Sequence, residues 1–387
     1  MHSAPFSVEV SVTSLSQENE YISNLDPLKA DQLIHKLPFL NQKKDTIELV
    51  LLLVDIMPSM NEIHTFDKYQ ANAAIRDIGF LLGSLKRHQV EPVNIIPELE
   101  DKMNLMGEKS GLPPRDTLLH YTVWNPTDFR RRTYTGTQDE QFLIESVVVA
   151  MEPLVRCIIL LRNLHLTSLS SPEFKIICQE IVALFENVIE GIVIARRKVS
   201  PSYFANELRF YFDPIILNNR EYLGPGAVEM PMFVFDHLLW SSDCQDEEYR
   251  IFKETYLPYI HPEMRNIYLE FENKSSMVSK VCRLADGQVE FNSIILDSLK
   301  SLSSCCRLLK SFRMPHKKIA EEAYAHTKKQ DLTFTTNENT HRNHGSGGYS
   351  TDILTHILNL TNQKIDMLEI CISNFQAPES GRNISRN

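Results

Sequence analysis

The spacing of hydrophobic residues predicts a protein made almost entirely of α-helices. Apolar residues recur three and four positions apart through most of the chain, which is the period of an amphipathic helix. Between residues 66 and 85, for example, Ile75, Ile78, Leu81 and Leu82 follow this spacing. Segments in which apolar and polar residues alternate, as in half-buried strands, are almost absent. We therefore predict an all-α fold.

The same pattern sets the approximate limits of the helices. We expect a polar lead-in over residues 1–24, a helix opened by Asp26 and Pro27, a buried helix over residues 43–63 and another over 66–85. Further helices are expected over residues 141–164, 172–197, 201–212, 232–242, 246–257, 262–281, 287–326 with a break near Pro315, and 351–373.

A break at Gly111, followed by two prolines, divides the chain into two predicted domains. A small N-terminal helical domain is expected over residues 1–110 and a large helical domain over residues 111–375. Residues 376–387 are expected to form a disordered tail. A chain of 387 residues is long enough for this division.

Composition narrows the range of partners and compartments. The formal net charge of -10 argues against nucleic acid or an anionic membrane as a partner. No apolar run approaches the ~18 residues of a transmembrane helix, and the N-terminus lacks the features of a signal peptide. Seven cysteines without metal-binding spacing fit a reducing compartment. We expect a soluble, cytoplasmic protein that is a monomer or a homodimer.

One helical segment, residues 311–324, carries His316 and, three positions earlier, Arg313. A neutral imidazole is a strong axial ligand for haem iron. Residues three apart share a helix face, so Arg313 can pair with a haem propionate. Without further context, a helical histidine is more often a surface residue or a core residue with its hydrogen bonds satisfied.

Asp236 lies inside an otherwise apolar helix, where a carboxylate is costly unless it has a partner. A haem-ligating imidazole usually donates its second N–H to a carboxylate, a carbonyl or water, so Asp236 is a candidate partner of His316. The alternatives are an N-cap or a buried ion pair. His237 is a second candidate iron ligand, but no arginine lies at the matching position beside it.

Further candidates for ligand binding are Arg209 and two glycine-rich loops. The planar fork of Arg209 suits a carboxylate, although the residue can equally pair with Glu207 or Asp213. The loop Gly224-Pro225-Gly226-Ala227 permits close approach of backbone to a flat ligand, or forms a simple turn. The loop Gly345–Gly348 has no preceding strand and no following lysine, which argues against a nucleotide site.

The order of these motifs resembles the C-terminal half of the indoleamine 2,3-dioxygenase superfamily. The resemblance rests on the Arg-x-x-His helix, the later Gly-x-Gly-Gly loop, the Phe-Asp-x-Leu-Leu stretch around Asp236 and the Leu-Arg segment around Arg209. It implies a helical domain that binds haem b without a covalent bond, with His316 as the axial ligand of the haem iron. It also implies that Arg209 holds the substrate carboxylate.

Other roles implied by the resemblance concern the distal side of the haem. Phe204 would pack beside the indole, and the loop with Gly224, Pro225, Gly226 and Ala227 would lie against the haem. Ser346 would contact the substrate ammonium or dioxygen.

The distal wall is expected from residues 141–146, where this chain departs from the dioxygenase pattern. Gln141 stands in place of a phenylalanine and Glu145 in place of the pocket serine, so the pocket is expected to be more polar, unless the register is shifted by one residue. This departure points to a subfamily. The segments 114–126, 130–136 and 208–240 resemble monodechloroaminopyrrolnitrin synthase-like haem enzymes of tryptophan-derived secondary metabolism. The similarity covers most of residues 110–375 and is thin over residues 1–100.

The function implied is that of a haem-dependent oxygenase. Its substrates would be dioxygen and L-tryptophan or a substituted tryptophan, with oxidation and rearrangement of the indole ring, and an electron donor as an optional further partner. Ring cleavage to N-formylkynurenine is the alternative, against which the polar residues Gln141 and Glu145 argue. A non-catalytic haem-binding protein and a cofactor-free interaction protein are two further alternatives.

Overall fold

The computed structural model describes residues 12–287, 292–331 and 352–376, and it confirms the all-α fold. Within those residues the strands are limited to one antiparallel hairpin, β1 (Ile215–Leu217) and β2 (Arg220–Tyr222). Asn218 and Asn219 connect them with positive φ angles of 50° and 58°, as a tight hairpin turn requires. Among the helices described, none combines the length and the apolar character that a membrane span requires.

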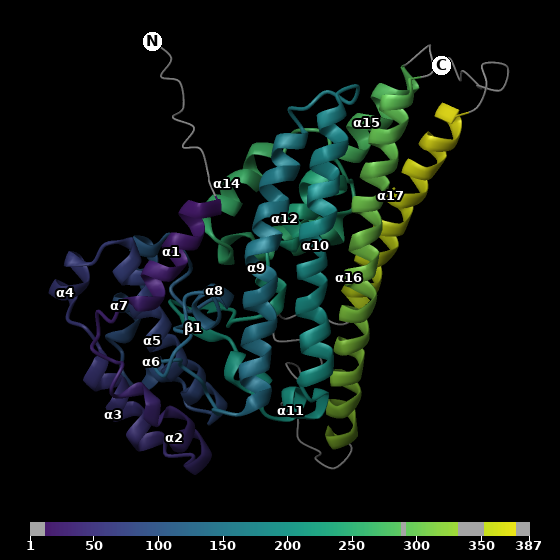
Figure 1. The fold of residues 1–387 in the computed structure, drawn as a ribbon. Coiled ribbons are helices and arrows are strands. Elements are labelled where there is room, and N and C mark those ends of the chain that lie inside the picture. Colours follow the sequence, from purple (N-terminus) through teal and green to yellow (C-terminus); the bar gives the residue numbers. More distant parts are fainter. Residues whose placement is uncertain (1–11, 288–291, 332–351, 377–387) are drawn as a thin grey trace, which may run out of the picture.

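The N-terminal part of the chain folds around α5, a helix that is buried along most of its length (Figure 1). Its helices are α1 (Val12–Asn24), α2 (Leu37–Lys43), α3 (Thr46–Ile56), α4 (Met60–Thr65), α5 (Lys68–Arg87), α6 (Pro92–Ile95), α7 (Leu99–Ser110) and α8 (Leu118–Tyr121). The helix expected over residues 66–85 corresponds to α5, which Asp67 caps through the backbone N–H groups of Tyr69 and Gln70.

Two expectations near the N-terminus were wrong. The segment expected as a polar lead-in contains α1, whose Leu15 and Ile22 are buried in the large core. Asp26 does not open a helix, because its carboxylate accepts hydrogen bonds from the backbone N–H groups of Ala30 (2.7 Å) and Asp31 (3.2 Å) and so closes a turn.

The buried helix expected over residues 43–63 is two helices, and one face of the first is open to solvent. Helix α3 ends at Ile56, since the residue before Pro58 is pushed out of the helical region, and Ser59 then caps α4. The side chains of Ile47, Leu51 and Val54 are 73%, 53% and 53% exposed.

The large helical part is built on long, roughly parallel helices, with α9, α10 and α16 side by side and α17 against α16 (Figure 1). Its helices are α9 (Gln138–Leu164), α10 (Pro172–Lys198), α11 (Pro201–Asn206), α12 (Met232–Asp236), α13 (Glu247–Tyr256), α14 (Pro262–Phe271), α15 (Met277–Asp286), α16 (Ser293–Asp331) and α17 (Asp352–Gln376). Helix α12 continues as a π-helical turn over His237–Ser241. Hydroxyl side chains of Thr137, Ser171 and Ser200 cap α9, α10 and α11.

Three of the expected helices differ in this part. The helix expected over residues 201–212 ends at Asn206 as α11 and is followed by a 3₁₀-helix over Leu208–Phe212. The helix expected over residues 262–281 is divided by a turn into α14 and α15, and Ser276 caps the N-terminus of α15. The break expected near Pro315 is absent, because α16 runs continuously through this proline. Helix α16 packs against α10 and α17, and such tertiary packing stabilises a helix that contains a proline.

Two clusters of buried apolar residues form the core. The larger one joins α9, α10, α12 to α17 and α1, and the smaller one surrounds α5. The smaller cluster also takes in Leu208, Tyr211, Phe212 and Ile215, which follow α11 in the chain. The division at residue 110 therefore stays a prediction, since both clusters draw on both sides of it.

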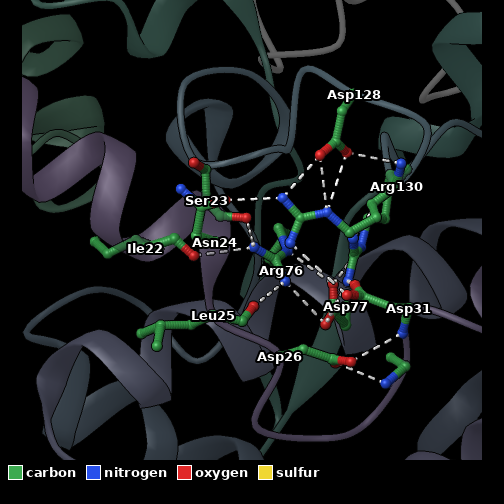
Figure 2. A network of polar contacts seen from close by, with 12 residues as sticks. Ile22, Ser23, Asn24, Leu25, Asp26, Asp31, Arg76, Asp77, Asp128 and Arg130 are labelled. Carbon is green, nitrogen blue, oxygen red and sulfur yellow. Dashed lines mark hydrogen bonds and ion pairs between the residues drawn. The ribbon is translucent and has the colours of Figure 1, made fainter.

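A buried ion-pair network joins the beginning of the chain to the segment after α8 (Figure 2). Asp77 of α5 accepts hydrogen bonds from Arg76 Nε (2.7 Å) and Arg132 Nε (2.8 Å), and these three side chains are fully buried. The guanidinium of Arg76 also donates to the backbone carbonyls of Ile22 (3.2 Å) and Leu25 (2.9 Å). Burial alone would raise the pKa of Asp77, but the two arginines outweigh it and hold the pKa low.

We predict that Asp77→Ala destabilises the protein by about 3–5 kcal/mol, because it leaves the buried guanidinium of Arg76 without its counter-ion and leaves Arg132 with Asp31 alone. Denaturant unfolding at neutral pH measures the loss. Asp128→Ala is the control, since this exposed carboxylate pairs only with Arg130 at the surface. Equal stability of the two variants would contradict the role given to Asp77.

Candidate active site

A cavity of about 290 Å³ lies among the long helices of the large helical part. Helices α9, α10, α16 and α17 supply its walls, and α11, α12, α13 and the loop over residues 225–230 close it. Most of the side chains around it are apolar, including Leu143, Val147, Val188, Phe233 and Ile357. A cavity with apolar walls and a few polar groups is the usual form of a small-molecule or cofactor site.

His316 lies in the wall of this cavity, on α16. Its ring is half-buried and its centroid lies 5.7 Å from that of Phe312. Burial, reinforced by the nearby charge of Arg313, lowers the pKa of His316 to about 4. The imidazole is therefore neutral at physiological pH. In the part of the chain that the structure describes, its ring makes no hydrogen bond, so both ring nitrogens are free to bind a ligand.

Asp236 lines the same cavity, and the structure supports the ion-pair alternative for it. Its carboxylate accepts hydrogen bonds from the guanidinium of Arg313, from Tyr249 Oη (2.5 Å) and from Trp240 Nε1 (3.1 Å). The expected hydrogen bond to His316 is not present among the described residues. Three buried side chains, from the π-helical extension of α12, from α13 and from α16, thus meet at the carboxylate of Asp236.

Arg313 also lines the cavity, but its guanidinium is already held by protein groups. It pairs with Asp236 and donates to Thr361 Oγ1 on α17, and it lies 5.9 Å from the centroid of the Trp240 ring. A contact between Arg313 and a haem propionate stays a prediction, and it would compete with the pair to Asp236.

His237, the second candidate ligand, is not among the residues around the cavity. Its ring stacks on Tyr268 with centroids 3.9 Å apart, and its Nδ1 lies 3.3 Å from Lys253 Nζ. Burial lowers the pKa of His237 to about 3 and that of Lys253 to about 8. Lys253 also donates to the backbone carbonyl of Ser241 (3.0 Å), so this pair stabilises the π-helical turn after Asp236.

The expected positions of the distal residues on α9 were wrong. Gln141 and Glu145 are exposed and lie outside the cavity wall, whereas Leu143, Ser146 and Val147 line it. One residue turns a helix by about 100°, so the alternative register, shifted by one residue, would bring Ser146 to the pocket in place of Glu145, and it stays a prediction. The argument that a polar pocket disfavours ring cleavage therefore loses its basis.

Most of the site residues predicted around α11 and in the loop over residues 225–230 border the cavity, but one does not. Phe204, Pro225, Gly226 and Ala227 all border the cavity. Arg209 does not; it lies on the 3₁₀-helix Leu208–Phe212 with its guanidinium 5.3 Å from the centroid of the Phe210 ring. The roles given to these residues stay predictions.

Two further predicted site residues are Gly224 and Ser346, of which the structure describes Gly224. Gly224 is not part of the wall, and a Cβ there would lie 2.5 Å from the carbonyl oxygen of Phe212 and 2.6 Å from Arg115 Nη2. Glycine is therefore needed at this position for close packing against Arg115. Ser346 and the loop Gly345–Gly348 lie outside the described residues.

Glu229 is a buried acid directly behind the cavity wall that sequence analysis missed. Its Oε2 accepts a hydrogen bond from the backbone N–H of Leu118 (2.6 Å), and its Oε1 is buried without a partner among the described residues. Burial, with the nearby charge of Asp116, raises the pKa of Glu229 well above its ordinary value. The hydrogen bond from Leu118 ties the loop over residues 225–230 to the start of α8. No sequence pattern indicated this role, since Glu229 follows a loop and has no periodic neighbours.

A helical domain that encloses an apolar cavity, with one neutral imidazole in its wall, is the arrangement expected of an all-α haem-dependent oxygenase. Comparison with known families supports this class, because the family model described as Monodechloroaminopyrrolnitrin synthase PrnB matches residues 18–370. The chain belongs to this family, whose enzymes are haem-dependent oxygenases acting on a tryptophan-derived substrate in pyrrolnitrin biosynthesis. The match confirms the resemblance found in the sequence and extends it into the N-terminal part.

We predict that Glu229→Gln makes the protein more stable relative to the native chain as the pH rises. The acid has a higher pKa in the folded than in the unfolded protein, so folding takes up protons above the ordinary carboxyl pKa and stability falls as the pH rises through that range. Glutamine removes this dependence, which amounts to at most about 1.4 kcal/mol per pH unit. Denaturant unfolding between pH 5 and 8 tests it, with the exposed Glu186→Gln as control. A pH-independent difference would contradict the raised pKa of Glu229.

Proposed function

We propose that this protein binds haem b through His316 and uses dioxygen to oxidise and rearrange the indole ring of L-tryptophan or a substituted tryptophan. Family membership supplies the reaction class. The observation that carries the proposal is the neutral imidazole of His316 in the wall of the apolar cavity.

The donor set around the cavity fits a haem. The porphyrin supplies four of the iron ligands itself, so one imidazole from the protein is sufficient. The pKa of His316, lowered to about 4, keeps this nitrogen unprotonated and available at neutral pH. When bound, the haem would supply the activation of dioxygen, while the protein orients the substrate and excludes water.

Substrate positioning falls to residues on the α11 side of the cavity. Phe204 and Phe212 offer aromatic surface for an indole, and Ser146 is the one hydroxyl on the α9 wall. Arg209 remains the clamp that the family resemblance predicts for the substrate carboxylate, although it is not among the residues that border the cavity. Fixing both reactants in this way lowers the entropic cost of bringing them together.

Ring cleavage to N-formylkynurenine is the second candidate function. It is favoured by the apolar character of the α9 wall, in which Leu143, Val147 and Ala150 border the cavity in place of the polar pair expected from the sequence. The two reactions differ in their products, since ring cleavage retains both oxygen atoms of dioxygen in an open-ring kynurenine.

We predict that His316→Ala abolishes haem-dependent oxidation of tryptophan, because the iron loses its protein ligand. His326→Ala is the matched control, as an exposed histidine on the same helix. Visible spectra of the haem-reconstituted proteins, with mass analysis of products from L-tryptophan and 7-chlorotryptophan, measure ligation and reaction together.

A His316→Ala protein that keeps the native Soret band and the native products would refute this proposal. Formation of an open-ring kynurenine by the native protein would favour the second candidate function instead.

A further inference from the structure

Only some of the charged side chains that border the cavity form an ion pair with one another. Four are present, Arg196, Asp236, Arg313 and Glu322. Asp236 and Arg313 form a buried ion pair and neutralise each other. Arg196 and Glu322 are exposed to solvent although they border the cavity, so they mark its mouth.

Arg196 is the cation of this mouth. It belongs to the last turn of α10, close to the start of α11. Among the described residues it makes no ion pair or hydrogen bond. Its guanidinium is thus available to an incoming anion, whereas that of Arg313 would first have to leave Asp236. Glu322 has the opposite charge and would repel an anionic ligand.

We propose that Arg196 binds a carboxylate at the mouth of the cavity. The planar guanidinium matches a carboxylate with two parallel hydrogen bonds. This inference rests on the proposed function, which provides two sources of that group, a haem propionate and the carboxylate of the amino acid substrate. In the second case Arg196, which borders the cavity, takes the role predicted for Arg209, which does not. Neither the position nor the spacing of Arg196 in the sequence signalled this role, because the mouth is formed only when α10, α11 and α16 come together.

Arg197 provides a matched control. It is the next residue of α10, it is exposed, and it does not border the cavity. Arg196→Gln and Arg197→Gln therefore remove the same charge from the same helix turn, and only the first removes it from the mouth. Both sites are exposed, so both variants are expected to fold, and circular dichroism verifies this.

The experiment has two arms. In the first, haem-free native and variant proteins are titrated with haem and with haem dimethyl ester, in which the propionates are blocked. In the second, the haem-loaded proteins are titrated with L-tryptophan and with tryptamine, which lacks the carboxylate. Loss of a charge-assisted hydrogen bond should weaken binding about tenfold.

A propionate contact predicts that Arg196→Gln binds haem about tenfold more weakly while binding the dimethyl ester as the native protein does. A substrate contact predicts the same loss for L-tryptophan and none for tryptamine. Native affinity of Arg196→Gln in both arms, or an equal loss in Arg197→Gln, overturns the inference and leaves the proposed function intact. Failure of the native protein to bind haem overturns both.

Discussion

The architecture of the cavity depends on the buried ion pair between the carboxylate of Asp236 and the guanidinium of Arg313. The carboxylate accepts hydrogen bonds from Arg313 on α16, Tyr249 on α13 and Trp240 in the π-helical turn, and Arg313 in turn reaches α17 through Thr361. Each of these polar groups is buried and would be costly without its partner. Because Arg313 lies one turn before His316, the same ion pair fixes the part of α16 that presents the imidazole to the cavity.

The fold could be predicted from the sequence because helical periodicity is a local property. The prediction is wrong where tertiary contacts, and not the local sequence, determine whether a helix forms, continues or is buried. Pro315 leaves α16 continuous because neighbouring helices hold it, and Asp26 closes a turn instead of capping a helix. The apolar face of α3 with Ile47 and Leu51 was expected in the core, yet the pattern alone cannot tell which faces find a partner.

The candidate site could be predicted only in part, since residue types and spacing do not give helix phase or pairing. His316, Phe204 and Gly226 were chosen from motifs and do border the cavity. Gln141 and Glu145 were expected in the cavity wall but lie on the exposed face of α9, and the wall is made by Leu143, Ser146 and Val147. Tyr249 and Arg196 were missed because their importance depends on contacts between elements distant in the chain.

The central claim is that the imidazole of His316 ligates the haem iron, and resonance Raman spectroscopy of the ferrous, haem-loaded protein tests it most directly. The account predicts an iron–imidazole stretching band in the native protein, its absence in His316→Gly, and its return when free imidazole is added to that variant. An unchanged band in His316→Gly without added imidazole would contradict the account.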